Sequence, residues 1–449
     1  MRWFVGATIL LVLGIVFQLG LLVYAMYALL GVMLLSRFLT REWIENLSAT
    51  RECSRDTAEI GDKVALAVNI RNSGVFPIPW LLLEDSLPHD ALVQRPPRIK
   101  VDGRRMGLIQ LRPLGEKSLL YQVNFLMRGY YQIGPLLIES GDLFGLHRRY
   151  KVVTEPQFIL VLPKIIPLVG YDLMSRRPIG EVRITHRLFE DPTRISGVRE
   201  YQAGDALNRV HWKATARTGI LHSKVFEPSS VAGATIVLDF HRESYPSQGE
   251  PHRSELGITT AASLANAVQQ MGQQIGLVSN GRDAADRVRQ EGWKHEFRTR
   301  AAAKENFGMQ EESDRLQPVT VATRRGTEQL TYILETLARL ELTDGLTFPQ
   351  LLIEATSRMP RDATVIAILS EVTEETAIAL GNLKRQGFSV TAVLILDDDT
   401  KQLGTSGPYQ SQYDFADSAG RLMAEGINFR RADNEAAISA LCSQQLIPH

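Results

Sequence analysis

Hydrophobic positions follow three different spacings along the chain, and each spacing predicts a different kind of structure. The first is an uninterrupted apolar run of 34 residues, from Trp3 to Ser36, that contains no charged residue. As a single helix this run would reach roughly 50 Å, against a hydrocarbon core of about 30 Å. The weak polar break at Gln18-Leu19-Gly20 therefore favours a transmembrane helical hairpin within residues 1–40.

Two other interpretations of this run lead to different locations for the protein. A single tilted helix is the main alternative, whereas a cleaved signal peptide fits less well because no small-residue cleavage site follows the run. Arg2 precedes the apolar run, and Arg37 and Arg41 follow it. For a hairpin, the positive-inside rule places both ends in the cytoplasm, so we expect a cell membrane protein with cytoplasmic soluble domains. A single span would place those domains on the other side.

The second spacing has period two and covers residues 47–163. It is clearest in Val64, Leu66, Val68 and Ile70, and it returns in apolar runs at Trp80–Leu83, Leu119–Phe125 and Gln132–Ile138. Turn signals such as Asn72-Ser73-Gly74 and Gly134-Pro135 separate these runs. Period two is typical of strands with one buried face, so we expect a small antiparallel β-sandwich.

The third spacing, over residues 234–449, alternates short apolar strands with amphipathic helices. Strands are expected at Thr235–Asp239, Ile275–Ser279, Thr364–Ser370 and Ser389–Leu396, and helices near Glu255–Met271, Thr327–Leu340, Glu374–Arg385 and Asn434–Leu441. This alternation is typical of an α/β doubly wound sheet. The polar stretch Asp283–Gln317 is expected to be a long surface excursion.

The composition of the chain mainly excludes certain functions and sites. The chain of 449 residues carries 50 Lys plus Arg and 50 Asp plus Glu, so its overall charge indicates no nucleic-acid partner. Cys53 and Cys442 lie too far apart in the sequence to suggest a disulfide framework or a metal site. No phosphate-binding loop occurs, and therefore any ATPase activity has to come from a partner.

One region, residues 164–233, departs from this neutral average and forms a basic connector. Residues 176–224 hold ten Lys or Arg against five Asp or Glu. Within it we expect a helix that begins at Ala206, is capped by Asp205 and ends at Gly219. The candidate partner-binding residues are Arg199, Tyr201, Gly204, Asp205, Arg209, His211, Trp212, Lys213 and Arg217.

These residue types are compatible with three roles. In a structural role, His211 is a hydrogen-bonded boundary residue, Trp212 packs, and the arginines form ion pairs that dock the connector. In a binding role, Trp212, Arg209 and Arg217 receive an acidic partner. In a catalytic role, Asp205 and His211 act as acid and base of a hydrolase, although no nucleophile has a recognisable context.

The stretch Arg199–Leu221 resembles the signature of the domain-of-unknown-function 58 family. The resemblance extends to Arg128–Pro135, Asp142–Leu146 and Leu160–Pro163, and thus covers most of the chain in order. It implies an N-terminal membrane hairpin, a β-rich segment and a von Willebrand factor A-like C-terminal domain. It also implies association with MoxR-type AAA+ ATPases and a role in assembly or maturation of other proteins.

Magnesium-binding von Willebrand A domains carry Asp-x-Ser-x-Ser after their first strand. Here the corresponding stretch is Asp239-Phe240-His241-Arg242-Glu243, so the aspartate is kept, both serine positions are replaced, and Ser244 is out of register by one. Asp239 is thus a weak metal candidate, and we expect it to end a buried strand and cap backbone amides. No other metal or cofactor is expected.

The sequence as a whole predicts a membrane-anchored multidomain protein with a transmembrane hairpin, a β-sandwich and a von Willebrand A-like α/β domain. The expected function is that of a non-enzymatic adaptor or scaffold that works with a MoxR-type ATPase in protein assembly or envelope maintenance. The alternatives are a hydrolase that uses Asp205 and His211, and a purely structural membrane protein.

Overall fold

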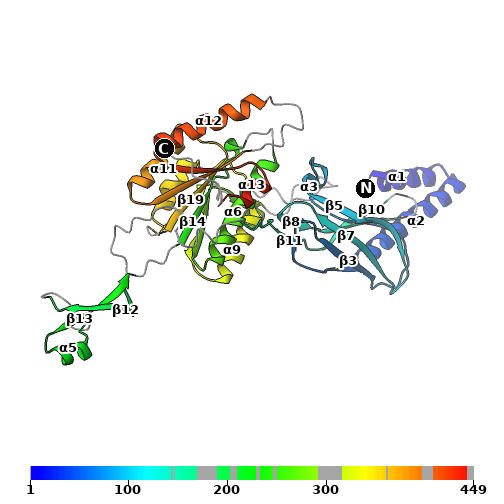
Figure 1. The fold of residues 1–449 in the computed structure, drawn as a ribbon. Helices are drawn as coiled ribbons and strands as arrows, with labels where there is room; N and C mark the ends of the chain where they lie inside the picture. Colours follow the sequence, from blue (N-terminus) through cyan, green and yellow to red (C-terminus); the bar gives the residue numbers. More distant parts are fainter. Residues whose placement is uncertain are drawn as a thin grey trace. The chain divides into compact units, whose positions relative to one another are not determined.

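The chain divides into two compact units (Figure 1). The computed structural model describes residues 2–142, 145, 147–168, 190–202, 210–228, 233–245, 250–291, 316–360, 363–396 and 408–441. The first unit comprises Met1–Lys164, Asp283–Ser313 and Leu337–Leu340, and the second comprises Ile165–Arg282, Asp314–Thr336 and Glu341–His449.

Two apolar helices begin the first unit, and they are separated at the predicted polar break. α1 (Arg2–Val16) is followed by a turn in which Gln18 has φ +54°, and α2 (Gly20–Glu45) begins directly after it. The two helices pack side by side, as Figure 1 shows, because glycine at position 14 leaves room for Leu22. Among the described residues, α2 is the helix long and apolar enough to cross a membrane, and α1 is shorter.

α2 runs past the end of the apolar run because its last turns belong to the sandwich. Trp43 and Ile44 are buried there. A single residue, Asn46, separates the helix from the first strand. Lys151 of the sandwich donates from Nζ to the carbonyls of Ile44 and Leu47, both at 3.1 Å. A cation at a helix C-terminus also complements the helix dipole.

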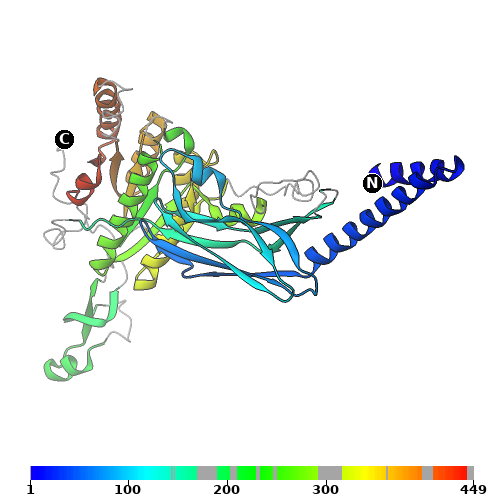
Figure 2. The same ribbon diagram turned by 90° about the vertical axis from the view of Figure 1, so that its right-hand side faces the viewer.

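The sandwich of the first unit consists of two four-stranded antiparallel sheets, ordered β1-β3-β7-β5 and β10-β9-β4-β6, and a three-stranded sheet β2-β11-β8 (Figure 2). Its elements are β1 (Leu47–Cys53), β2 (Thr57–Glu59), β3 (Lys63–Asn72), β4 (Ile78–Asp85), α3 (His89–Val93), β5 (Ile99–Gly103), β6 (Met106–Leu111), β7 (Glu116–Phe125), β8 (Gly129–Ile133), β9 (Leu136–Gly141), β10 (Arg148–Thr154) and β11 (Gln157–Leu162). The expected antiparallel strands are confirmed, and the run Gln132–Ile138 is divided between β8 and β9 by the Gly134-Pro135 turn.

Period-two alternation explains how the two large sheets share one core. Val64, Leu66 and Val68 of β3 are fully buried, and they belong to the same hydrophobic cluster as Leu81 and Leu83 of β4 in the other sheet. Alternate residues of a strand point to opposite faces, so the other face of β3 carries Lys63, Asn69 and Arg71.

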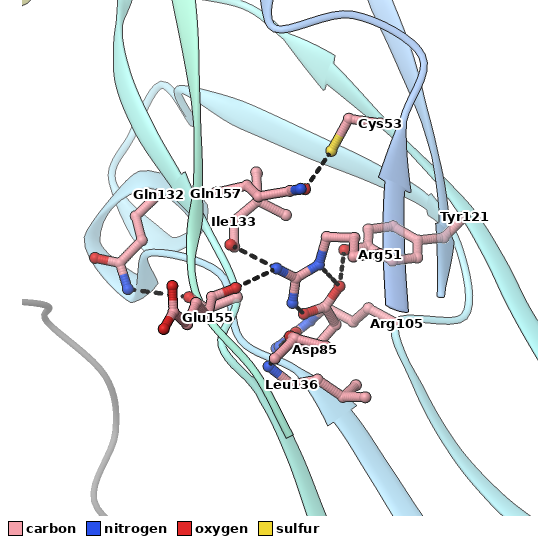
Figure 3. A network of polar contacts seen from close by, with 12 residues as sticks. Arg51, Cys53, Asp85, Arg105, Tyr121, Gln132, Ile133, Leu136, Glu155 and Gln157 are labelled. Carbon is pink, nitrogen blue, oxygen red and sulfur yellow. Dashed lines mark hydrogen bonds and ion pairs between the residues drawn. The ribbon is translucent and has the colours of Figure 1, made fainter. Parts of the chain in front are cut away.

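A buried ion pair crosses this apolar core (Figure 3). Arg51 of β1 donates from Nε to Oδ2 of Asp85 at 3.1 Å, and its Nη2 binds the other carboxylate oxygen. Tyr121 of β7 donates to Asp85 Oδ2 at 2.6 Å. The Arg51 Nη1 donates to the carbonyls of Ile133 and Glu155, at 3.1 and 3.0 Å. Three separate segments therefore satisfy one guanidinium, and Tyr121 from a fourth supports the carboxylate.

Two neighbours are adapted to this pair. Burial, together with the negative charge of Asp85, raises the pKa of Tyr121 well above its usual range, so the phenol stays a hydrogen-bond donor. Gly134 has φ +86°, and a Cβ at this position would overlap the guanidinium of Arg51. Only glycine combines this backbone conformation with the close approach.

The second unit contains a six-stranded sheet in the order β17-β15-β14-β19-β20-β21. Five strands are parallel, and the edge strand β17 is antiparallel to β15. The strands are β14 (Gly233–Leu238), β15 (Gln274–Ser279), β17 (Val319–Arg324), β19 (Ala363–Leu369), β20 (Ser389–Ile395) and β21 (Asn428–Ala432). The helices are α6 (His252–Gln270), α9 (Thr327–Arg339, whose last residues fall in the first unit), α10 (Phe348–Thr356), α11 (Glu374–Arg385), α12 (Pro408–Ala424) and α13 (Glu435–Ser439), whereas α7 (Ala284–Glu291) belongs to the first unit.

Helices cover both faces of this sheet. Leu238 and Ile395 lie next to Gly257 of α6. Strand residues of the opposite parity, such as Val237 and Leu394, share a core with α10, α11 and α12. Strand order 3-2-1-4-5-6 with helices on both faces defines a doubly wound α/β sheet. The expected strands and helices appear within a few residues of their predicted ends, whereas β17, β21, α10 and α12 were not predicted.

Removing one partner of the buried pair should destabilise the sandwich. We expect Asp85→Asn to lower the free energy of unfolding by about 3–5 kcal/mol, because it leaves the Arg51 charge buried and uncompensated. Asp102→Asn breaks the exposed Lys63–Asp102 pair and is expected to cost less than about 1 kcal/mol. Urea unfolding of the detergent-solubilised protein measures both. Equal losses would show that the buried pair does not hold the sandwich together.

The thiol of Cys53 should react slowly. Partial burial raises its pKa from 9.0 to about 11, and Asp56 and Asp85 act in the same direction against Arg51. At pH 8 we therefore expect alkylation in a Cys442→Ser variant to be about 100-fold slower than for a thiol of ordinary pKa, since only the thiolate reacts. The rate should still rise between pH 9 and pH 10. A plateau near pH 9 would contradict the raised pKa.

Candidate functional site

The sequence signature folds as a hairpin of two strands with a short helix between them. β12 (Glu190–Glu200) pairs antiparallel with β13 (His222–Pro228), and α5 (Trp212–Thr218) lies between them. The ladder continues beyond the strands, because the N–H of Tyr201 donates to Leu221 O at 2.9 Å and that of His211 donates to His222 O at 2.8 Å.

The expected helix start at Ala206 and its cap Asp205 lie outside the described residues, and α5 begins at Trp212. A single helix from Ala206 to Gly219 is excluded, because Val210 makes a β-bridge with Ser223. The side chain of His211 then caps the helix, with Nδ1 accepting the N–H of Ala214 at 3.0 Å. The expected helix end is confirmed, since Gly219 adopts the left-handed conformation at φ +73°.

Side-chain bonds tie α5 to β13. Thr215 Oγ1 donates to His211 O at 3.2 Å and accepts the N–H of His222 at 3.1 Å. Thr218 Oγ1 lies 3.2 Å from His222 Nδ1. The short helix is therefore held in place by its own neighbours in the sequence.

The predicted site residues divide into three groups. Trp212 is 69% exposed, and Arg199, Lys213 and Arg217 are exposed as well. His211 and Tyr201 are half-buried, so His211 is the hydrogen-bonded boundary residue of the structural interpretation. Gly204, Asp205 and Arg209 lie outside the described residues, and with them the predicted Asp205/His211 pair. The described residues leave the indole of Trp212 largely uncovered, so it does not have the packing role of the structural interpretation. Together with Ile220 it adds exposed apolar area to this basic surface.

The second candidate, Asp239, lies at the carboxyl end of β14 and is 2% exposed. As expected, it accepts a backbone N–H of the next loop, that of His241, at 3.2 Å on Oδ1. Ser244 Oγ donates to Oδ2 at 2.7 Å although it is one residue out of register. The short 3-10 turn Arg242–Ser244 brings Ser244 to the carboxylate in spite of the one-residue shift.

Asn280 completes this cluster, although no motif in the sequence pointed to it. Its Nδ2 donates to Asp239 Oδ1 at 2.8 Å and to Leu346 O at 3.0 Å, while its Oδ1 accepts the N–H of Phe240 at 2.6 Å. These partners fix the orientation of the amide, with its NH₂ group toward the carboxylate. The available signal was its position directly after β15, because the ends of adjacent parallel strands lie together.

The carboxylate of Asp239 is thus surrounded by neutral hydrogen-bond donors. Burial raises its pKa above the ordinary value, and the bonds from Asn280, Ser244 and His241 oppose that shift. An NH₂ group that faces a carboxylate is a poor neighbour for a cation. In the described part of the chain no group of three or more His, Cys, Asp or Glu side chains could hold a metal ion.

A groove of about 780 Å³ lies elsewhere on the second unit, between α10 and α11. Apolar residues Leu352, Ile353 and Ile378 line it, together with Glu375 and Arg385. None of the predicted site residues contributes to this groove.

Comparison with known proteins supports the family resemblance. Residues 197–300 match the family described as protein of unknown function DUF58. The chain is also 24% identical over 276 residues to the uncharacterized protein YeaD of Bacillus subtilis. This alignment covers 61% of the chain and 65% of the relative. The matched family segment contains the stretch Arg199–Leu221, Asp239 and Asn280.

The similarity of this chain to solved structures is too low to support a conclusion about its fold or function. The CARDB domain of a Pyrococcus furiosus protein is 13% identical, with a TM-score of 0.18, and the match covers 26% of this chain and 87% of that domain. Proximal thread matrix protein 1 from the mussel byssus is 10% identical, with a TM-score of 0.28, and covers 47% of this chain and 46% of its own.

The Asp239 cluster should be important for stability. Asn280→Ala removes the amide that bonds Asp239, Phe240 and Leu346, and we expect it to lower the unfolding free energy by about 1–3 kcal/mol. Asn382→Ala, an exposed asparagine on α11, is the matched control and should change it by less than about 0.5 kcal/mol. Urea unfolding compares them, and similar values for the two variants would show that the cluster contributes nothing specific.

Proposed function

We propose that this protein is a non-enzymatic, membrane-anchored adaptor that presents its signature hairpin to a protein partner. The single observation that carries the proposal is the exposure of Trp212 on a tightly bonded support. A tryptophan buries a large area when it is covered, and it is enriched among the residues that dominate binding energy. Arg217 and Lys213 beside it suit an acidic partner surface.

The partner we propose is a MoxR-type AAA+ ATPase, as the family resemblance implies. The sequence has no phosphate-binding loop, which supports the proposal that the partner hydrolyses the nucleotide. Together the two proteins would act in protein assembly or envelope maintenance.

The α/β unit is proposed to be a von Willebrand A-like domain without a metal. The doubly wound sheet and an aspartate directly after its first strand support the first part. The second part rests on Asn280, whose NH₂ group occupies one side of the Asp239 carboxylate. Asp239 is then a structural node that holds the loop Phe240–Tyr245.

The anchor is proposed to be the hairpin of α1 and α2, with the soluble units in the cytoplasm. The antiparallel packing of two apolar helices supports the hairpin, and the positions of Arg2, Arg37 and Arg41 support the orientation. On the described residues, no observation favours the hydrolase alternative.

The binding role of Trp212 can be tested by pull-down from detergent-solubilised membranes, with and without ATP. For a hot-spot residue, we expect Trp212→Ala to weaken partner capture by about 2 kcal/mol, roughly a 30-fold loss of affinity, at an unchanged melting temperature. Tyr332→Ala, which removes another exposed aromatic ring on α9, is the control and should retain the partner.

Two outcomes would oppose this proposal. A melting temperature lowered by Trp212→Ala would mean that the indole stabilises the fold. Full capture of an ATPase by the variant, or capture of none by the wild type in any nucleotide state, would remove the signature hairpin as its docking site.

A further inference from the structure

One end of the β-sandwich is built around the junction with α2. β1 begins there at Leu47, which pairs with Asn72 at the end of β3. β6 ends at the same place, because Leu111 pairs with Ile78 at the start of β4. Three connections turn at this end: residues 73–77 between β3 and β4, residues 112–115 between β6 and β7, and the connection between β9 and β10, because β9 is antiparallel to β4 and ends beside its start. The first two loops form the rim.

The rim is held by buried polar bonds. Asn72 is 1% exposed, and its Nδ2 donates to Phe76 O at 2.9 Å and to Arg112 O at 3.1 Å, one carbonyl in each loop. Its Oδ1 accepts the N–H of Gly74 at 2.9 Å. Ser73 donates its N–H to Asn46 O at 2.9 Å, which ties the first loop to the end of α2.

This rigid support presents apolar side chains outward. Val75 is 74% exposed and Leu114 is 67% exposed. Leu114 has φ +55°, a region that a leucine seldom occupies, and its N–H bonds Gly74 O at 3.3 Å. Because these apolar residues lie on two loops that bond each other, they are grouped at one place, and a grouped apolar surface indicates a contact outside the core.

One aromatic pair shows beside which part of α2 the rim lies. Phe76 packs edge to face against Phe38 of α2, with ring centroids 6.4 Å apart. Phe38 follows Arg37, the first charged residue after the apolar run. In a membrane-spanning helix, the change from apolar to charged residues marks the headgroup region, where aromatic rings are enriched.

Charge at the rim suits the same surroundings. Arg37, Arg71 and Arg112 are exposed around it, and Arg41 forms an ion pair with Glu45 at 2.8 Å. Glu116, which begins β7, is the exposed acid next to the second loop. Apolar tips surrounded by arginines are the composition of surfaces that enter an anionic lipid interface.

We propose that the rim is a second membrane contact, in which Val75, Phe76 and Leu114 enter the headgroup region of the bilayer that α2 spans. This inference rests on the anchor part of the proposed function. It gives the sandwich a defined orientation, with the rim on the membrane and the opposite end, which carries α3, directed away from it.

The test places a fluorescent label at single cysteines in the full-length protein, in a Cys53→Ser/Cys442→Ser background. The four positions are Val75 and Leu114 on the rim, Leu29 in α2, and Val93 on α3, which is 59% exposed and serves as the matched control. The protein is reconstituted in vesicles of phosphatidylcholine and phosphatidylglycerol, and a brominated lipid quenches labels that touch acyl chains.

We expect quenching at Val75 and Leu114 to be several-fold stronger than at Val93, and strongest at Leu29. Strong quenching at Leu29 with rim labels that match Val93 would overturn the rim contact and leave the anchor intact. A blue-shifted but unquenched rim label would mean that a protein, such as a second copy of this chain, covers the rim. Absence of quenching at Leu29 would overturn the anchor and the rim contact together.

Discussion

The sandwich depends on satisfying one buried positive charge. Arg51 is enclosed by an apolar core, and its partners come from the end of β4, the end of β8 and the turn after β10, with Tyr121 supporting the carboxylate. A guanidinium without these partners would be strongly unfavourable in that environment. The strands must therefore adopt one arrangement for the charge to be paired, and Gly134 provides the space in which this arrangement closes.

The same arrangement determines how the anchor meets the soluble domain. Only Asn46 separates α2 from β1, and Lys151 bonds carbonyls on both sides of it. A helix and a strand joined by one residue, with bonds across the junction, leave little freedom for a hinge. The orientation of the sandwich therefore follows the orientation of α2. Because Phe76 packs against Phe38, the rim lies beside the end of the apolar run of α2 and meets the same membrane interface.

Local patterns predicted most of the fold, and long-range partners account for what they missed. Alternation identified β3, and the polar break at Gln18 identified the two helices, because both signals lie within a few residues. The helix expected over Ala206–Gly219 does not run through Val210, because Val210 pairs with Ser223 of the returning strand. Arg51 and Asn280 were missed for the same reason: their partners come from distant segments whose approach only the folded sheet reveals.

The two candidate sites differ in what remains available for interaction. At Asp239, three donors bond the two carboxylate oxygens, and the NH₂ group of Asn280 occupies one side of the carboxylate. At the signature hairpin the backbone is equally well bonded, yet Trp212 stays exposed. A rigid support lowers the entropy that an exposed side chain loses on binding. Function is therefore better sought in what the hairpin presents than in chemistry at the end of the sheet.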